Sequence, residues 1–430
     1  MTTIITGTLM LMSIFSVNFT FAYWQGNVLG HSTSKGGQVD IGEWNRTKVL
    51  IHVHDNLSRT YSDFYVQIES GESLGDDFDD YFKFDSLDPL PKNHPGVDLS
   101  LYSFDGWYLD NGVAFTKNTV VNSNIDVYPS WNVDSSQFVY TLSSGMYNIN
   151  KTAGFNLVGD LYIPGWRYKG REINMVGSYS YKFTNYDFGG SLTIGAGIKR
   201  IYTTTFYNAT ATTLTLEEGL EEIQNSSFYT LHTSGDLVFP STILTVGQTA
   251  FQKATFDGTI DFSLATKLTT TGSHAFEGIT FQGDLVIGSG FVEIKHSSFS
   301  NIPFYGALDL SNASNLESIV TSAFSGAKIT SIIFPTNGKL KSFGTSSFQN
   351  TAIVMTDLYL PNTVETISAQ TFSNTKFTNI YIPLSVTYIG GSAFFGSPNA
   401  TFYYEGSSIP AEWAANWNWY NCPVVFNAVF

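Results

Sequence analysis

The sequence has a single cysteine, Cys422, in 430 residues. One thiol cannot form an intramolecular disulfide, and a zinc site built from several thiolates is excluded as well. The stability of the fold must therefore come from packing. Hydrophobic residues make up 43% of the chain, which is enough for a large buried core.

Charge is also scarce. Only 13% of the residues are charged, about half the usual share, and the formal net charge is −15. Proteins that bind phosphates need clusters of Lys and Arg, and none occurs here, so no nucleic-acid partner is predicted and anionic membrane surfaces are disfavoured. A surface rich in Ser, Thr, Asn and aromatic residues is typical of β-rich extracellular proteins.

Only one long hydrophobic stretch is present, from Ile4 to Phe21. It predicts a secretory signal peptide over residues 1–22, with cleavage after Ala22. No Lys or Arg precedes the stretch, so an uncleaved anchor or a truncated start remains an alternative. No second apolar run of about 20 residues follows, so membrane attachment is expected only through this N-terminal segment, if at all.

Motifs for catalysis and for cofactor binding are missing. The sequence has no Gly-x-Ser-x-Gly elbow, no phosphate-binding Gly-rich loop with Lys, and no His-Glu-x-x-His. His232, His274 and His296 fall at different points of the repeat described below, which suits loop positions better than one site. We therefore predict a protein that is not an enzyme and has no cofactor.

The pair His52 and His54 is the one short histidine spacing. On a strand both imidazoles point to one face, which is a two-ligand metal geometry. No third ligand is evident nearby, because Asp55 would point the other way. The favoured interpretation is two half-exposed strand histidines and no metal.

An acidic cluster over residues 76–80, with Asp85, could in principle offer carboxylate oxygens to calcium. The spacing does not match an EF-hand loop. A solvated linker is the favoured interpretation.

What the sequence does have is a repeat. An aromatic residue recurs every 22 to 25 positions, five residues after an apolar one, as in Ile223 to Phe228 and Ile389 to Phe394. Such regular spacing over ten copies indicates a repeat architecture. The recurring aromatic residues are Tyr181, Phe206, Phe228, Phe251, Phe276, Phe299, Phe324, Phe348, Phe372 and Phe394.

A short alternating strand precedes each of these units. Leu214-Thr-Leu216 and Ile380-Tyr-Ile382 are examples, and Pro383 shows the proline that often ends the strand. One such unit cannot bury its own apolar side chains, whereas stacked units form a continuous core. A period in this range, with one strand per repeat, predicts a leucine-rich-repeat solenoid with a parallel sheet over residues 132–404.

The repeats resemble the BspA-type, or Treponema pallidum-type, leucine-rich repeat. The copy from Ile380 to Phe394 follows that pattern of a strand, Pro, and Val-x-x-Ile-Gly-x-x-Ala-Phe. Asp160 to Ile173 is similar to the opening repeat of the family, and Tyr403 to Val425 to its closing segment. The resemblance implies a protein that is secreted or exposed on the cell surface, where similar proteins are often implicated in adhesion, and together with the resemblance described next it implies a bacterial origin.

A second resemblance lies upstream. The stretches Tyr102 to Asp110 and Asn124 to Trp131 look like one Listeria–Bacteroides repeat, a small β-grasp-like module, over residues 76–131. Residues 23–75 contain two alternating segments, 49–54 and 64–69, and are predicted to be a β region of unknown fold. The predicted fold class is thus mainly β throughout.

The outward side chains of the repeat strands offer a candidate binding surface. If Leu161 and its counterparts point inward, the neighbouring residues form a column on the open sheet face that starts at Tyr162. Tyrosines in this column suit protein recognition, although stacking between coils could equally serve only to stabilise the sheet. The predicted partner-binding residues are Asp309, Ile333, Asp357, Tyr359, Tyr381 and Tyr403.

The last segment, residues 405–430, is predicted to cap the solenoid. Trp413, Trp417, Trp419 and Pro423 give it bulk, with a carbohydrate site as the alternative for the tryptophans. We predict an exported, adhesin-like protein of the cell surface or the extracellular medium that binds a host matrix or envelope protein. A carbohydrate-binding surface protein and a structural envelope protein without a soluble ligand remain the alternatives.

Overall fold

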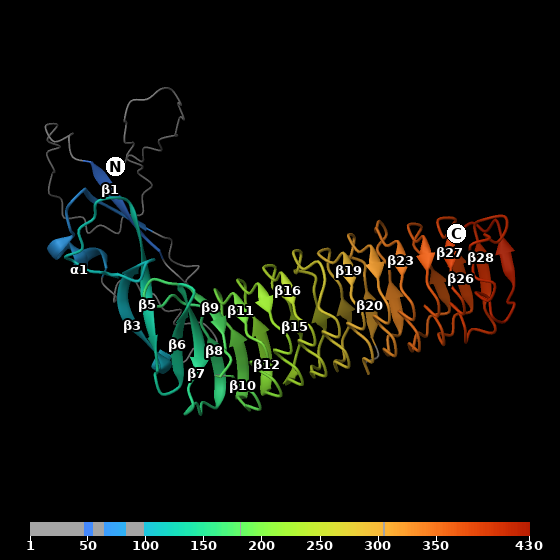
Figure 1. Ribbon diagram of the computed structural model, residues 1–430, viewed down its shortest axis with the longest axis horizontal. Helices are drawn as coiled ribbons and strands as arrows, with labels where there is room; N and C mark the ends of the chain where they lie inside the picture. The colour runs from blue at the N-terminus through green and yellow to red at the C-terminus, as the bar shows by residue number, and fades with distance from the viewer. Residues whose placement is uncertain (1–46, 55–63, 83–98, 181, 304–305) are drawn as a thin grey trace, which may run out of the picture. The chain divides into compact units, whose positions relative to one another are not determined.

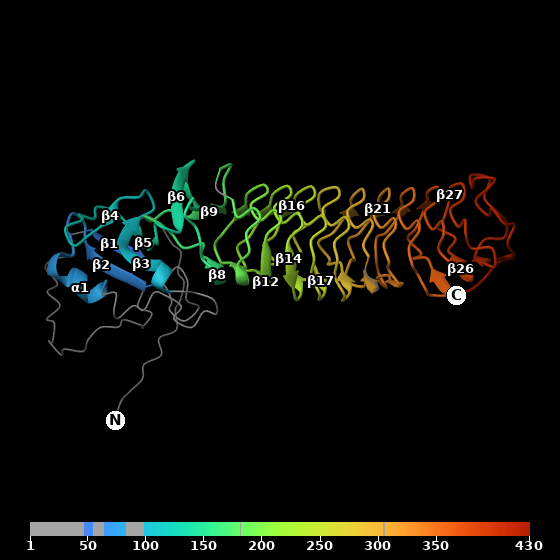
Figure 2. The ribbon, with the colours of Figure 1, turned by 90° about the horizontal axis from the view of Figure 1, so that it is seen from below.

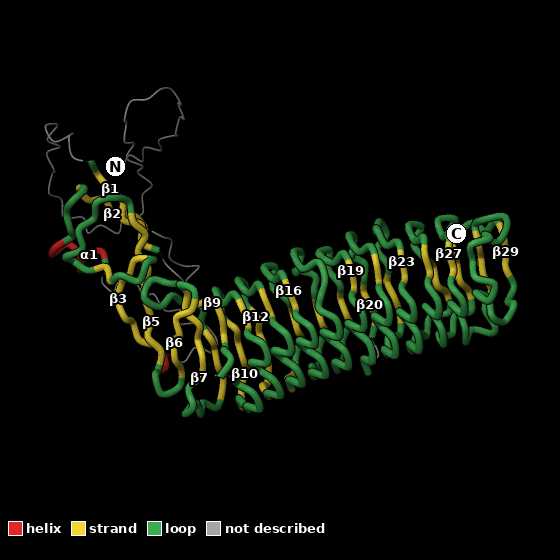
Figure 3. Tube along the Cα trace, in the orientation of Figure 1, coloured by secondary structure: helices red, strands yellow, loops and turns green. Residues whose placement is uncertain are grey.

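The computed structural model describes residues 47–54, 64–82, 99–180, 182–303 and 306–430. The predicted signal peptide, Asp55, Asp85 and Tyr181 lie outside the described residues. In the described ranges nearly all regular structure is β (Figure 3). The helical elements there are α1 (Phe78–Tyr81) and the single 3₁₀ turns η2 (Gly75–Asp77) and η3 (Leu99–Leu101), which confirms the predicted mainly-β fold class.

The first sheet has five strands in the order β2-β1-β5-β3-β4. Strand β1 pairs antiparallel with β2 and parallel with β5, so segments far apart in the sequence lie side by side. The inward side chains of these strands, with Ile51 and Val127 fully buried, form a small core of their own. The strands are β1 (Lys48–Val53), β2 (Phe64–Glu69), β3 (Tyr102–Leu109), β4 (Ala114–Phe115) and β5 (Ile125–Val133).

The second part is a solenoid of stacked coils, which Figures 1 and 2 show as a regular staircase of strands from green to red. It begins with the hairpin of β6 (Phe138–Ser143) and β7 (Met146–Lys151). The alternating segments then form parallel strands along one side. These are β8 (Gly159–Ile163), β10 (Gly189–Ile194), β12 (Thr210–Leu216), β14 (His232–Ser234), β15 (Leu237–Val238), β17 (Ile260–Asp261), β18 (Leu285–Val286), β20 (Ala307–Asp309), β22 (Ser331–Ile333), β24 (Asp357–Tyr359), β26 (Asn379–Ile382), β28 (Thr401–Tyr404) and β29 (Val424–Phe426).

Most coils also carry a second, shorter strand at the apolar residue five positions before the recurring Phe. The sequence predicts one strand per repeat, and the structure adds this one because neighbouring backbones there lie close enough to pair, as at Ile201 and Ile223. These strands are β9 (Ile173–Val176), β11 (Arg200–Ile201), β13 (Glu222–Ile223), β16 (Thr245–Val246), β19 (Glu293–Ile294), β21 (Ser318–Ile319), β23 (Ser342–Phe343), β25 (Thr366–Ile367) and β27 (Tyr388–Ile389).

The recurring phenylalanines form one continuous stack inside the solenoid. Successive ring centroids lie 4.9 to 5.7 Å apart with nearly parallel planes, from Phe183 to Phe394. Among the described residues the stack begins at Phe183, which lies seven residues after Val176, whereas Phe206 follows Ile201, the residue paired with Val176, by five. Each of these rings is buried, so each contributes roughly 1.5–3 kcal/mol through burial.

The turns that carry this stack use left-handed backbone at two fixed places. The residue two positions before the Phe has φ near +55°, as at Thr204 and Ser226. The residue two positions after it is also left-handed and is usually Asn or Gly, as at Asn350 and Gly326. Asn and Gly tolerate this region best, so their recurrence is the local signal for the turn.

The C-terminal coil is covered by tryptophans. Trp413 and Trp417 are buried, and the Trp417 ring lies 4.8 Å from Phe402. Trp419 remains 54% exposed. Strand β29 pairs with β28, so the parallel sheet continues into this segment.

The described residues belong to one compact unit. Across the described residues, no helix is long and apolar enough to cross a bilayer.

Candidate functional site

Three tyrosines stand in one ladder on the outer face of the last sheet. The register pairs Tyr359 with Tyr381 and Tyr381 with Tyr403, as the repeat alignment predicts. The rings of Tyr359 and Tyr381 stack at 4.1 Å, and those of Tyr381 and Tyr403 at 4.8 Å. Their strand neighbours Leu358 and Ile380 are buried, which follows from the two-residue alternation of a strand.

The six predicted binding residues fall into two groups. Asp357 and the three tyrosines share the sheet of β24, β26 and β28, whereas Asp309 and Ile333 pair with each other on the preceding sheet. The two sheets are separate at this point, because no pairing joins β22 to β24 among the described strands. Tyr359 is 51% and Ile333 46% exposed, so both groups face solvent.

At the N-terminal end of the solenoid, the predicted outward column of side chains is covered by other residues. Tyr162, the expected first outward residue, is only 3% exposed. Its ring lies against Gly195, where a Cβ would be 2.4 Å from the ring, and its hydroxyl donates a hydrogen bond of 2.9 Å to Glu217. Burial raises the pKa of the Tyr162 hydroxyl. Sequence alternation gives the direction of a side chain and not what covers it.

Sequence reasoning missed the apolar residues that flank the tyrosines. Phe430 lies edge-on to the ladder, with its ring centroid 5.3 Å from Tyr381 and 6.3 Å from Tyr359. On β29, Val425 pairs with Tyr403 and is 44% exposed. The signal was present, because Val424-Val425-Phe426 continues the strand pattern one further coil. We refer to Tyr359, Tyr381, Tyr403, Val425 and Phe430 as the aromatic patch.

Polar groups adjoin the aromatic patch. The Asn379 amide donates a hydrogen bond of 2.5 Å to Asp357 beside Tyr359. A side-chain hydrogen bond with Tyr359 raises the pKa of the Tyr381 hydroxyl to about 12. The patch thus combines flat aromatic rings with polar hydroxyl groups, a combination suited to binding protein surfaces.

The pKa of Tyr381 gives a direct test of the ladder geometry. We expect Tyr359→Phe to lower the Tyr381 pKa from about 12 toward 10, since the substitution removes the hydroxyl that holds Tyr381 protonated. A raised pKa stabilises the folded state below pH 10, and this contribution is lost as the pH rises toward 12. Titration by NMR with ring-labelled tyrosine measures it, and an unchanged Tyr381 pKa would contradict the contact. Tyr388→Phe, on the other column of strands, is the control.

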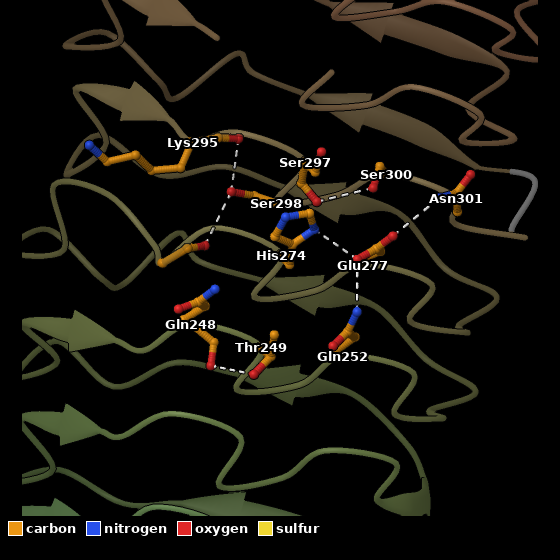
Figure 4. A network of polar contacts seen from close by, with 11 residues as sticks. Gln248, Thr249, Gln252, His274, Glu277, Lys295, Ser297, Ser298, Ser300 and Asn301 are labelled. Atoms are coloured by element: carbon orange, nitrogen blue, oxygen red, sulfur yellow. Dashed lines mark hydrogen bonds and ion pairs between the residues drawn. The ribbon is translucent and has the colours of Figure 1, made fainter. Parts of the chain in front are cut away.

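Two histidines of the solenoid take part in a polar network between coils. His274 and His296 lie in turns of adjacent coils, as predicted for loop positions, and their ring centroids are 5.3 Å apart. The Nδ1 atom of His274 lies within hydrogen-bond distance of the Glu277 carboxylate, at 2.8 Å. The same carboxylate accepts hydrogen bonds from the side-chain amides of Gln252 and Asn301 (Figure 4). This network joins neighbouring coils, which is a structural role.

A different histidine pair does gain a third ligand. Asp126 of β5 lies within hydrogen-bond distance of both His52 and His54, so the expectation of no nearby third ligand is wrong. The hydrogen bond from His54 lowers the pKa of Asp126. In the part of the chain that the structure describes, His52, His54 and Asp126 are the one set of three His, Cys, Asp or Glu side chains whose ligand atoms lie close enough to hold a metal ion.

Parallel coils of about two dozen residues, each with a leucine-bearing strand and an internal Phe, define a leucine-rich-repeat solenoid. Comparison with known families matches the BspA type leucine rich repeat region in six copies, over residues 175–305 and 303–410. These ranges span more than half of the chain, so the protein belongs to this family. No enzymatic family is indicated.

Solved structures of other leucine-rich-repeat proteins are also similar. A leucine-rich repeat protein from Bacteroides ovatus shares 17% identity and covers 64% of this chain and 70% of its own, with a TM-score of 0.44. The pneumococcal vaccine antigen PcpA shares 16% identity, covering 69% and 85%, with a TM-score of 0.31. A leucine rich cell surface protein from Faecalibacterium prausnitzii shares 17% identity, covering 64% and 95%, with a TM-score of 0.24. Comparison with curated proteins gives no match.

Proposed function

We propose that the protein is an exported, non-enzymatic binding protein of the cell surface or extracellular medium, and that the aromatic patch contacts a protein partner. The observation that carries the proposal is the tyrosine ladder on the outer sheet face, in which Tyr359 remains 51% exposed although it stacks on Tyr381. Rigid tyrosines with polar tips are enriched where proteins bind one another. A host matrix or envelope protein is the expected partner.

Two sequence-based predictions, each for a region outside the residues that match the family, support export. The hydrophobic stretch within residues 1–22 predicts a signal peptide, and residues 76–131 resemble a Listeria–Bacteroides repeat of bacterial surface proteins. Membership of the BspA-type family agrees with such a location. The low content of charge and of cysteine does not conflict with it.

The test is a double substitution in the patch. Tyr359→Ala with Tyr381→Ala should weaken binding to a captured partner about tenfold or more, because the loss of two central aromatic contacts removes most hot-spot energy. Purified protein is first screened against immobilised matrix and envelope proteins, and affinity is then measured by surface plasmon resonance. The matched control is Tyr388→Ala, a 41% exposed tyrosine on the other column of strands.

Circular dichroism must show that the double variant is folded. Unchanged binding by the folded double variant would show that the ladder serves only the stability of the sheet. Equal loss in the Tyr388→Ala control would place the contact elsewhere on the solenoid.

A carbohydrate-binding function is the second candidate, and one observation favours it. Trp419 is 54% and Tyr420 40% exposed, and both rings lie within 6 Å of Phe395. Buried Trp413 and Trp417 are not available to a sugar. Glycan-array binding that is lost in Trp419→Ala would support this function, and a structural envelope protein would instead show self-association in sedimentation experiments.

A further inference from the structure

The outer face of the first sheet brings two imidazoles and a carboxylate together. On β1, Ile51 and Val53 point into the core, so His52 points to the opposite face. His54 follows at the end of the strand, where its backbone N–H donates a hydrogen bond of 2.9 Å to Val127. In the parallel ladder His52 pairs directly with Asp126 of β5, which places that carboxylate on the same face.

The ligand atoms of these three residues converge. The Oδ1 of Asp126 lies 3.0 Å from Nδ1 of His52 and 2.7 Å from Nε2 of His54. All three ligand atoms lie within 4.8 Å of one another. Zinc bonds of about 2.0–2.1 Å at tetrahedral angles separate ligand atoms by roughly 3.3 Å, so the two bonded pairs would move apart by roughly 0.3 and 0.6 Å to admit an ion.

Stacking holds both imidazoles in place. Tyr65 of β2 stacks on His52 at 4.3 Å, and Tyr128 of β5 stacks on His54 at 4.4 Å, each with an interplanar angle of 9°. Ring orientation is therefore fixed before any ion arrives, which is what supporting residues do at metal sites. Arg167 lies over the Tyr128 ring, 3.6 Å from its centroid, and its guanidinium is paired with Glu172 at 3.5 Å.

We propose that His52, His54 and Asp126 bind a divalent transition-metal ion of the zinc class. Two imidazoles and one carboxylate suit such ions, whereas calcium and magnesium prefer sites made of oxygen ligands. The ion takes the place of the protons that join the imidazoles to the carboxylate, since a ligating nitrogen must be deprotonated. The Asp126 side chain is 53% exposed, so the outer side of the ion stays open to water or to another ligand.

The site has a structural consequence for the sheet. Strands β1 and β5 pair over only three residues, and the ion would tie the end of β1 to β5. An ion that binds the folded state and not the unfolded chain stabilises the fold by mass action. Zinc should therefore raise the unfolding temperature of the first sheet.

The test is a calorimetric titration of the full chain, prepared without a polyhistidine tag, with zinc chloride. We expect one ion per chain. Asp126→Asn and His54→Gln should each weaken binding by more than about tenfold, because even the loss of a supporting residue costs that much. His232→Gln, which changes an exposed strand histidine of the solenoid, is the matched control and should bind zinc like the parent chain. Magnesium chloride should not bind.

Absence of saturable zinc binding by the folded chain would overturn the proposal. So would zinc binding that Asp126→Asn leaves unchanged, because the ion would then sit elsewhere. Circular dichroism checks the fold of each variant. If His54→Gln unfolds the sheet, zinc binding by Asp126→Asn decides the question. The Asp126 side chain is more exposed than that of His54, so its substitution should disturb the fold less.

Discussion

Phe206→Ala should destabilise the solenoid by roughly 3–5 kcal/mol, the cost of removing a fully buried aromatic ring from a packed core. Phe206 is 0% exposed and stacks between Phe183 and Phe228 at 5.2 Å on either side. The cavity would interrupt the stack, and neighbouring coils interact chiefly with each other, so cooperativity should fall as well. Urea unfolding followed by circular dichroism measures both effects.

The next residue provides the control. Tyr207 is 36% exposed and stacks on Tyr229 at 5.0 Å outside the core. Tyr207→Ala should change stability by no more than ~0.5 kcal/mol, as is usual for surface positions. Similar losses for Phe206→Ala and Tyr207→Ala would contradict a core that depends on the phenylalanine stack.

Removal of residues 405–430 should have the other large effect. The deletion removes the buried Trp413 and Trp417. Replacing a buried tryptophan with Ala typically lowers the free energy of unfolding by roughly 3–5 kcal/mol. It also exposes Phe402 and the free edge of β28, which now pairs with β29. An uncovered core and an open strand edge favour association, so we expect a lower unfolding temperature and soluble oligomers or aggregates.

A shorter deletion separates the cap from the tail. Removal of residues 429–430 leaves both tryptophans, β29 and the backbone hydrogen bonds of Asn427 and Ala428 in place, and it takes away only Val429, which is 97% exposed, and Phe430, which is 44% exposed. This variant should unfold like the full chain and remain monodisperse in light scattering. A monomeric, cooperatively folding chain without residues 405–430 would contradict the capping role.

The solenoid was predictable because its determinants are local and repeated. In each coil, the spacing of an alternating strand, an apolar residue and a Phe identifies the side chains that point inward. The stacking of coils follows from the need to bury these side chains. The ladder of Tyr359, Tyr381 and Tyr403 needed only this alignment and the two-residue period of a strand. The offset at Phe183 was missed because the opening coil departs from the period.

The remaining features depend on contacts that no local pattern contains. The third residue of the His52 and His54 cluster, Asp126, comes from 72 positions beyond His54. Asp126 lies beside the two histidines because β1 pairs with β5. Nothing in the local sequence pattern predicts that these two strands are neighbours in the sheet. The burial of Tyr162 likewise depends on Glu217, two coils further along.

The central claim is that the recurring phenylalanines form one buried column that unites the coils into a single solenoid with an open face. A crystal structure of the full chain tests it most directly. We predict successive rings from Phe183 to Phe394 about 5 Å apart and shielded from solvent, as parallel coils of a continuous stack require. Rings that face solvent, or that belong to unconnected cores, would contradict it.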